Sequence, residues 1–390
     1  YITARVSVMV KKKNIVLHNQ SRKPDNILRK ELGIKKMCSE VERKLPSFMS
    51  GFFAYLRGNV LPMTRLAYLR DIHFFCNYLI DETNLIDNAV VPKDIKSSDF
   101  DKIKGTDVNI FLDYCRSYTI EKEQNVHVFE NDQRSLSRKK SSVSVLFKYL
   151  YREGIVGRNI TDSFNPIRVP KPGERQIKAL QDDEVMRMLD AVVTGNNLTD
   201  KEKEYWKKTR LRDKTILLFF LTYGLRISEL QQLNLSSFNF NRGEFLIHRK
   251  RGKESLMPLN NTTYAAVIEY IENERVKDGL SPENEDALFL SLQRRRMTER
   301  QIREMVKKYT AIGLDTVRSA GYSPHKLRAT AATSLIGRGN SIYDVQALLD
   351  HENVTTTQLY ADHAKNSRRD LIKGFEWGED MIDNESDDKK

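Results

Sequence analysis

The sequence predicts a mainly α-helical protein with a small antiparallel β-sheet, divided into two domains. Apolar residues recur every three or four positions across residues 39–165, which is the spacing of amphipathic helices. Residues 238–259 alternate apolar and polar side chains on both sides of a turn at Gly252, which is typical of antiparallel strands. Residues 166–178 contain three prolines and one glycine, interrupt the helical spacing and predict an interdomain linker.

Composition narrows the class of protein further. The 390 residues include 65 Lys and Arg against 53 Asp and Glu, a net charge of +12 that favours a polyanionic partner, although charge alone explains only non-specific attraction. A hydrophobic content of 39% argues against a disordered chain. The chain shows neither an apolar run of ~20 residues nor a secretion signal, so we expect a cytoplasmic protein without a membrane span. Three scattered cysteines fit a reducing compartment and argue against a zinc module.

The N-terminal half is expected to be a helical domain with a basic surface. Residues 1–38 are basic and weakly patterned and are expected to form an arm or lead-in, and residues 39–165 are expected to form the helical domain. Basic residues lie outside the apolar face of the helix predicted over residues 135–152, where they either contact a DNA backbone or form a solvated surface. They are Arg134, Arg138, Lys139, Lys140 and Lys148, of which Arg138, Lys139 and Lys140 are the candidate DNA contacts. Lys171 in the linker is a further candidate for a phosphate contact.

Residues 179–378 are expected to form the second domain, followed by an acidic tail over residues 379–390. A buried helix over residues 213–223 ends at Gly224, so Arg226 just beyond it would be half-buried and would need an anionic partner. That partner is either Glu229 or a ligand. The turn of the predicted sheet displays four basic residues, which either contact DNA or protect the sheet edge from aggregation. These are Arg249, Lys250, Arg251 and Lys253.

The segment of residues 323–363 gathers several side chains that suit phosphodiester chemistry. His325 and Arg328 are three residues apart, so they project from one face of a helix near its N-terminus, where an anion is favoured. His351 follows a predicted helix over residues 341–350, and Tyr360 lies shortly beyond it. Each of these residues alone is most simply explained by packing. Together with basic side chains elsewhere in the chain, they form a set able to hold a phosphodiester and attack it.

Four short motifs carry a resemblance to a known family. Residues 224–230 read GLRISEL, residues 325–328 HKLR, residues 349–351 LDH and residues 357–360 TQLY. In this order they resemble the tyrosine recombinases, closely over residues 176–373 and more weakly over the helical region before them. Within that family the chain looks most like the Xer-type recombinases, including the single-recombinase form of some Firmicutes. The resemblance implies a core-binding domain followed by a mixed α/β catalytic domain.

The resemblance implies roles that agree with the chemistry of the residues. Arg226 and Arg328 would clamp the scissile phosphate, whose charge grows in the transition state. Tyr360 would be the nucleophile that forms a 3′-phosphotyrosine. No metal or other cofactor is implied, because the basic side chains neutralise the phosphate.

Proton transfer and support would fall to the remaining residues of the set. Lys250 would protonate the leaving 5′ oxygen, with Lys253 as the rival for that role. His325 would assist proton transfer, His351 would donate a hydrogen bond to the phosphate, and Glu229 would orient the site. Ala329 departs from the family pattern, in which many members have histidine after the second arginine, and we expect altered support of the helix there rather than lost activity.

The implied reaction is site-specific recombination of double-stranded DNA by a homotetramer, through a Holliday junction. In the family a C-terminal apolar stripe docks on the adjacent protomer, for which the candidates here are Leu371, Ile372 and Phe375. A nicking–closing topoisomerase and a catalytically inactive DNA-binding protein are the competing interpretations. We expect an Xer-like role in chromosome dimer resolution, with a DNA translocase or accessory protein as partner. The alternative is an integrase of a phage or mobile element, which would normally carry a separate arm-binding domain.

Overall fold

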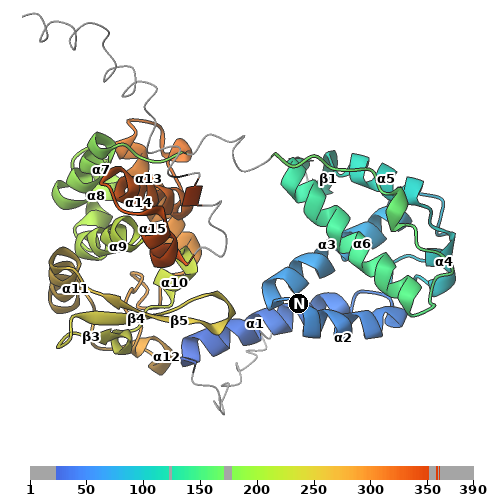
Figure 1. The fold of residues 1–390 in the computed structure, drawn as a ribbon, viewed down its shortest axis with the longest axis horizontal. Helices are drawn as coiled ribbons and strands as arrows, with labels where there is room; N and C mark the ends of the chain where they lie inside the picture. The colour runs from blue at the N-terminus through green and yellow to red at the C-terminus, as the bar shows by residue number, and fades with distance from the viewer. Residues whose placement is uncertain (1–22, 123–124, 171–177, 351–356, 359, 361–390) are drawn as a thin grey trace, which may run out of the picture. The chain divides into compact units, whose positions relative to one another are not determined.

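The computed structural model describes residues 23–122, 125–170, 178–350, 357, 358 and 360. The chain divides into two compact units between Pro170 and Lys171, within the residues predicted to be a linker. Both units are mainly helical, and each contains one small antiparallel sheet (Figure 1). The predicted fold class is therefore confirmed, with a second sheet that the sequence did not predict.

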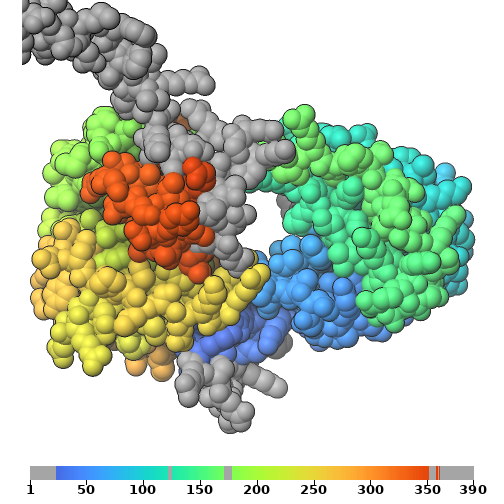
Figure 2. Space-filling view, viewed as in Figure 1, coloured from blue at the N-terminus to red at the C-terminus, as the bar shows by residue number. Residues whose placement is uncertain are grey.

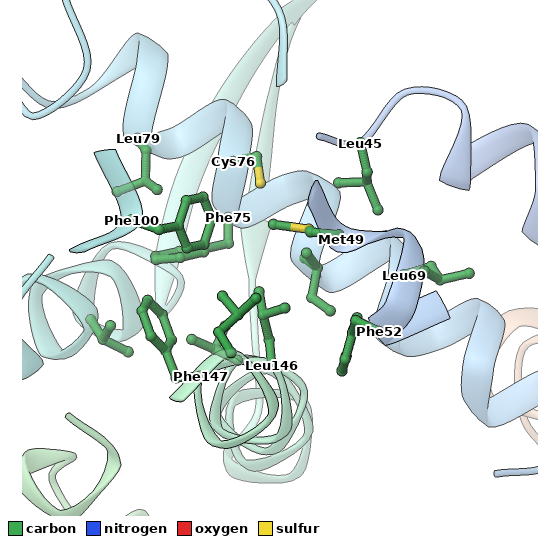
Figure 3. Packing of buried hydrophobic residues seen from close by; sticks show 14 of the residues in the cluster. Leu45, Met49, Phe52, Leu69, Phe75, Cys76, Leu79, Phe100, Leu146 and Phe147 are labelled. Carbon is green, nitrogen blue, oxygen red and sulfur yellow. The ribbon is translucent and has the colours of Figure 1, made fainter. Parts of the chain in front are cut away.

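The first unit consists of six helices and one hairpin among the described residues. In chain order these are α1 (Asp25–Glu42), α2 (Ser50–Asn59), α3 (Pro62–Asp81), α4 (Ser97–Lys102), α5 (Gly105–Tyr114), β1 (Ser117–Lys122), β2 (Asn125–Glu130) and α6 (Gln133–Arg152). The core of the unit lies where α3 and α6 meet (Figure 3), and it buries Phe75 and Phe147 completely. All three cysteines are buried, and none of them forms a disulfide.

Helix α1 begins well before the predicted start of the helical region. Residues 25–38 were expected to belong to a basic arm, yet they form a helix that packs against α3. Ile27, Ile34 and Cys38 are its buried residues and share one helical face. The lysines and arginines between them conceal this spacing in the sequence. Residues 1–22 lie outside the described residues.

The hairpin of β1 and β2 lies within the region of residues 39–165 that was predicted to be helical. Helix α5 ends at Tyr114, and β1 then pairs with β2 in antiparallel register, with Tyr118 opposite Phe129. The two rings stack with their centroids 5.2 Å apart. Every residue of β2 is exposed, including Val126 and Val128, so this strand has no buried face.

Of the candidate DNA contacts on α6, only Lys139 is buried within the unit, whereas the Arg138 side chain is exposed. Asp71 of α3 is buried and forms ion pairs with Arg138 and with Lys139, whose Nζ is 3.4 Å from Oδ1. Lys139 is only 7% exposed, and its ammonium lies 4.6 Å from the centre of the Phe74 ring. Lys140 donates to the carbonyl oxygen of Asn165 at 2.8 Å. The prediction that Lys139 forms part of a DNA-binding surface is therefore wrong, because its charge is buried in an ion pair.

The second unit contains nine helices and three strands among the described residues. They are α7 (Asp182–Thr194), α8 (Asp200–Trp206), α9 (Arg210–Tyr223), α10 (Ile227–Gln231), β3 (Phe238–Asn239), β4 (Glu244–His248), β5 (Glu254–Pro258), α11 (Asn261–Asn273), α12 (Pro282–Glu285), α13 (Glu299–Gly313), α14 (Pro324–Gly337) and α15 (Ile342–Leu349). The sheet has the strand order β3–β4–β5, with both pairs antiparallel.

Helix α9 is the centre of this unit. It packs against α7, α11 and α14, and Ile216, Phe219 and Phe220 are completely buried. A helix that is apolar on nearly every side needs such neighbours all round. Phe219 also meets Phe245 of β4 in a T-shaped contact with centroids 5.3 Å apart, which joins the sheet to the helical core.

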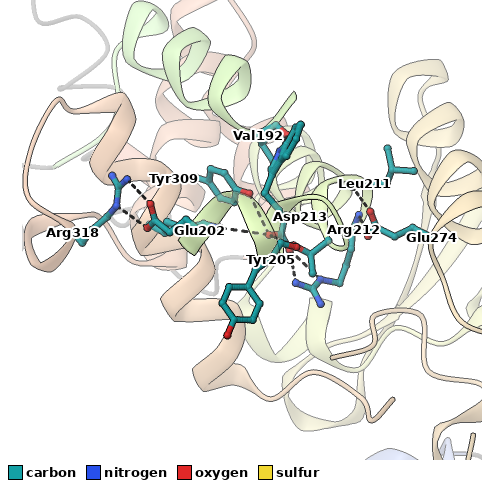
Figure 4. A network of polar contacts seen from close by, with 12 residues as sticks. Val192, Glu202, Tyr205, Leu211, Arg212, Asp213, Glu274, Tyr309 and Arg318 are labelled. Carbon is teal, nitrogen blue, oxygen red and sulfur yellow. Dashed lines mark hydrogen bonds and ion pairs between the residues drawn. The ribbon is translucent and has the colours of Figure 1, made fainter. Parts of the chain in front are cut away.

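The charged segment of residues 196–212 forms structure of its own. It contains α8 and the first turn of α9, and Glu202 of α8 accepts hydrogen bonds from Nε and Nη2 of Arg318, both at 3.0 Å (Figure 4). Arg212 forms a buried ion pair with Asp213 at 2.7 Å, and the Tyr309 hydroxyl donates to Asp213 at 3.4 Å. Burial and the negative charge of Asp213 raise the pKa of Tyr309. These polar contacts tie α8 to the 3₁₀ turn Arg318–Ala320 and α9 to α13.

Replacing Asp71 with alanine is expected to destabilise the first unit strongly. The substitution leaves Lys139 buried without its counter-ion, a situation that costs about 3–5 kcal/mol. The matched control is Asp113→Ala, since Asp113 forms an ion pair with Arg116 but its side chain is 81% exposed. Thermal unfolding should show a large loss for Asp71→Ala and almost none for the control. Equal losses would contradict the interpretation.

Gly224 combines a left-handed backbone with a close contact, and its substitution separates the two effects. Its φ is +56°, and a Cβ atom there would lie 2.5 Å from Cδ2 of Leu349. Gly243 has a similar φ of +62° but no atom within 4 Å of the added Cβ. Gly243→Ala should cost only the left-handed strain of about 1–2 kcal/mol. Gly224→Ala should cost about 1–3 kcal/mol more, because Leu349 must move. Unfolding free energies of the two variants test this difference.

Candidate active site

Three arginines converge on the C-terminal end of α15. Arg249 Nη2 donates to the carbonyl oxygen of Leu348 at 2.8 Å, Arg328 Nη2 donates to that of Leu349, and Arg226 Nη2 donates to that of Asp350 at 3.0 Å. The last carbonyl groups of a helix lack partners within it and carry partial negative charge, which accounts for the attraction. We refer to Arg226, Arg249 and Arg328 as the arginine cluster.

Arg226 is held by the turn that follows Gly224. It is the residue preceding α10, and Glu229 in the first turn of that helix accepts both from the Arg226 backbone N–H at 2.8 Å and from Nη1 at 2.7 Å. Glu229 is buried, so it fixes the direction of the guanidinium. The Arg226 side chain nevertheless remains 33% exposed, which makes it the most accessible arginine of the cluster. Glu229 is thus a partner of Arg226, one of the two alternatives that the sequence left open.

Arg328 comes from α14 and is 3% exposed. Its Nη1 donates to the carbonyl oxygen of Gly224 at 2.6 Å, so it ties together the end of α9 and the end of α15. Desolvation, followed by the positive charge of Arg226, lowers the pKa of Arg328 to about 10. The guanidinium therefore keeps its charge at neutral pH, although it is buried beside other cations.

Arg249 was predicted to be a DNA contact, but it is 6% exposed and belongs to the cluster instead. Its Nε donates to Ser255 Oγ of β5 at 2.8 Å, and its Nη2 reaches α15. The signal was present in the sequence, because Arg249 continues the alternation of Phe245 and Ile247, the buried residues of β4. An arginine on the buried face of a strand requires an internal partner.

Asp350 is a member of the site that the sequence analysis did not identify. Its carboxylate lies 3.7 Å from Arg226 Nη1 and 3.4 Å from Lys253 Nζ. Its backbone is left-handed, with φ +48°, and follows the last turn of α15. Asp is among the few residues with a side chain that adopt this conformation readily. An Asp directly after an apolar helix was therefore the available signal.

The two lysines of the turn between β4 and β5 differ in their surroundings. Lys253 reaches Asp350, whereas Lys250 is exposed and has no hydrogen-bond or ion-pair partner among the described residues. Lys250 and the exposed Arg251 lie in the short 3₁₀ turn Lys250–Gly252, where Arg251 has a φ of +64°. In Figure 2 the surface of α15, in orange-red, lies beside that of the strands, in yellow.

Tyr360 packs in an apolar group formed with α14 and α15. It is 6% exposed and belongs to an apolar group with Ala329, Ala332, Val345 and Leu349. Burial raises the pKa of Tyr360, and the positive charge of Arg328 opposes that shift. The phenol therefore lies within the field of Arg328.

His325 and the residues beside Arg328 complete the surroundings. His325 lies at an exposed position, yet desolvation by its neighbours lowers its pKa, and the charges of Arg328, Lys326 and Arg226 act in the same direction. Next to Ala329, Thr330 Oγ1 accepts a hydrogen bond from the Leu180 backbone N–H at 2.9 Å. Support of α14 at this point thus comes from the start of the second unit. His351, Lys171 and the predicted apolar stripe of residues 371–375 lie outside the described residues.

The described part of the chain offers neither a metal-binding cluster nor a membrane-spanning helix. Within it, no group of three or more His, Cys, Asp and Glu side chains is arranged to hold a metal ion. Among the helices of the same residues, none combines the length and the apolar character needed to cross a membrane.

Comparison with known proteins places the chain in a family. The sequence model of the phage integrase family matches residues 178–367. The tyrosine recombinase XerC of Natranaerobius thermophilus is 32% identical over 272 residues, which cover 69% of this chain and 81% of the relative. The tyrosine recombinase XerD of Oceanobacillus iheyensis is 29% identical over 328 residues, which cover 83% of this chain and 96% of the relative.

The fold agrees with that of a solved recombinase. The crystal structure of XerH site-specific recombinase bound to a palindromic difH substrate, a post-cleavage complex, superposes with a TM-score of 0.55 at 17% identity and covers 92% of this chain and 91% of that one. The similarity thus extends over both units. These similarities show that the chain belongs to the phage integrase family of tyrosine recombinases, which are enzymes of site-specific DNA recombination.

Proposed function

We propose that this chain cuts and rejoins double-stranded DNA through a 3′-phosphotyrosine on Tyr360 and exchanges strands through a Holliday junction. The observation that carries the proposal is the convergence of the arginine cluster beside a buried tyrosine. Arg328 donates to the Leu349 carbonyl, while Leu349 belongs to the same apolar group as Tyr360. A phosphate held by the cluster would therefore lie next to the phenol.

The arginine cluster supplies the charge that the reaction needs. Attack on a phosphodiester builds negative charge on the non-bridging oxygens, and fixed guanidinium groups stabilise that charge. Arg226 has the exposure to contact the phosphate directly. Arg328 lies deeper and contributes its charge while it holds the end of α15. His351, which the family resemblance assigns to phosphate binding, would add a hydrogen bond.

The shifted pKa values of Tyr360 and His325 suit a proton transfer from the phenol to the imidazole. Burial raises the pKa of Tyr360, so its phenol is protonated at neutral pH and needs a proton acceptor. The lowered pKa of His325 keeps its imidazole neutral at pH 7, the form that accepts a proton. The phenol oxygen bonds to phosphorus, the bond to the 5′ oxygen breaks, and that oxygen takes a proton from Lys250. The phosphotyrosine conserves the bond energy, so the incoming 5′ hydroxyl can reverse the step.

The relatives support an Xer-like role at a specific DNA site. Both XerC and XerD recombinases match over most of their length, and XerH was solved on its difH DNA. We extend to this chain a double-stranded DNA partner, assembly as a tetramer on that DNA, and a function in chromosome dimer resolution. Selection of binding sites from random duplexes, followed by mapping of the cleavage position, identifies the target and separates this role from that of an integrase.

Helix α6 offers a DNA-backbone surface in the first unit. A shallow hollow along it is lined by Ser137, Ser141 and Ser144 together with Lys140 and Lys148. Hydroxyl and ammonium groups in a row suit the phosphates of a DNA backbone. Lys148 is exposed, so it replaces the buried Lys139 among the proposed contacts.

Tyr360→Phe should bind the selected DNA as the unchanged protein does but form no covalent adduct, because only the phenol oxygen is removed. Denaturing gels of a nicked substrate measure the adduct, and mobility shifts measure binding. The matched control is Tyr343→Phe, since Tyr343 lies on α15 but is 73% exposed. An adduct that persists in Tyr360→Phe would show that another residue is the nucleophile.

Lys250→Ala should slow cleavage by about 10²–10⁴-fold on ordinary DNA, because the leaving oxygen lacks its proton donor. A substrate with sulfur at the bridging 5′ position should restore the rate, since a thiolate leaves without a proton. Lys253→Ala should show no such rescue, because Lys253 is paired with Asp350. Rescue of Lys253→Ala instead would transfer the role to Lys253, and rescue of neither would remove both lysines from it.

A further inference from the structure

Asp350 lies among cations that the recombination chemistry would direct at DNA. Its carboxylate contacts Arg226 and Lys253 on opposite oxygens, Oδ2 and Oδ1, and its own carbonyl oxygen accepts from Arg226 Nη2. The side chain is 24% exposed, so it stands at the surface of the cluster, where a ligand would approach. The carboxylate thus bridges the two cations with its two oxygens, as two oxygens of a phosphate would.

The charges of the site explain why an anion is needed there. Three arginines and Lys253 bring four positive charges together. Desolvation and then the positive charge of Arg226 lower the pKa of Arg328, which shows that these cations repel one another. Glu229 supplies one negative charge from the buried side of Arg226. Asp350 supplies the second from the exposed side. A cluster of this kind without a counter-ion repels itself and loses stability.

The left-handed backbone at the end of α15 does not by itself require a carboxylate at position 350. Asp350 adopts φ +48° and ψ 52°, a conformation that glycine adopts without strain. A carboxylate at this position therefore adds to the cluster something that the turn itself does not require.

We propose that Asp350 is the internal counter-anion of the arginine cluster and occupies, in the DNA-free chain, the place that a DNA phosphate takes on binding. The proposal rests on the function proposed above for Arg226 as a phosphate ligand. Binding of DNA exchanges one anion for another, with the carboxylate leaving Arg226 and Lys253 for solvent. Asp350 thereby weakens the binding of every oxyanion at the cluster and stabilises the empty site.

Asp350→Asn tests this exchange, because it removes the charge and keeps a side chain that tolerates the left-handed backbone. In chloride buffer its melting temperature should fall below that of the unchanged protein. Added sodium sulfate should then raise it more steeply, and half of the rise should occur at a several-fold lower sulfate concentration, because sulfate no longer competes with a carboxylate. Matched sodium chloride at the same ionic strength corrects for screening.

The matched control is Asp315→Asn. Asp315 also has a left-handed backbone, with φ +51°, but it is exposed and forms no ion pair among the described residues. Its sulfate response should equal that of the unchanged protein. If Asp350→Asn loses stability but responds to sulfate just as the unchanged protein does, Asp350 only supports the end of α15 and the proposal is overturned.

A second variant covers the case in which Asp350→Asn does not fold in chloride. Lys253→Gln removes one of the two cations that the carboxylate bridges, so its gain from sulfate should be smaller than that of the unchanged protein. An unaltered gain would also overturn the proposal. These measurements need no DNA cleavage, so their result is independent of the adduct assay on Tyr360. Loss of the sulfate effect with a normal adduct rejects Asp350 alone, whereas a sulfate effect without any adduct rejects the recombination chemistry.

Discussion

The attachment of α15 to three arginines is the interaction on which the candidate site depends. The carbonyl groups at the end of this helix are far in sequence from the three arginines that bind them. Arg226 comes from the turn after α9, Arg249 directly follows β4, and Arg328 lies on α14. Because each arginine binds a different carbonyl, the position of α15 and the directions of all three guanidinium groups are determined together. Tyr360 packs against the same helix, so its distance from the cluster follows from these contacts.

The buried helix α9 provides the rigid support behind the cluster. Its apolar surface holds α14 on one side and, through Phe219, the sheet on another. Gly224 ends it with a left-handed backbone, and the missing side chain leaves room for Leu349. The three sources of arginine are thus fixed to a single core element. Electrostatic catalysis requires such fixed groups, because charges that reorient during the reaction lose most of their effect.

The sequence predicted the parts of this site that lie in short contiguous motifs. Arg226 with Glu229, and His325 with Arg328, are neighbours on a single helical turn, so their spacing alone indicates that they act together. Arg249 and Asp350 were misassigned or missed, because their roles depend on partners 99 and 124 residues away. The same reason explains Lys139, whose basic charge resembles a surface residue until Asp71 is found beside it. The α1 helix was missed because charged residues mask its apolar periodicity, and the β1–β2 hairpin was missed because β2 has no buried face.

The central claim is that one phosphorus atom can bond to Tyr360 while the arginines hold its oxygens. A crystal structure of the protein on a nicked duplex of its selected site, with orthovanadate in place of the scissile phosphate, tests it directly. We predict vanadium bonded to the Tyr360 oxygen, with equatorial oxygens contacted by Arg226, Arg328 behind them, and the Asp350 carboxylate turned away. Vanadate bound apart from Tyr360, or bound with Arg226 directed elsewhere, would contradict the account.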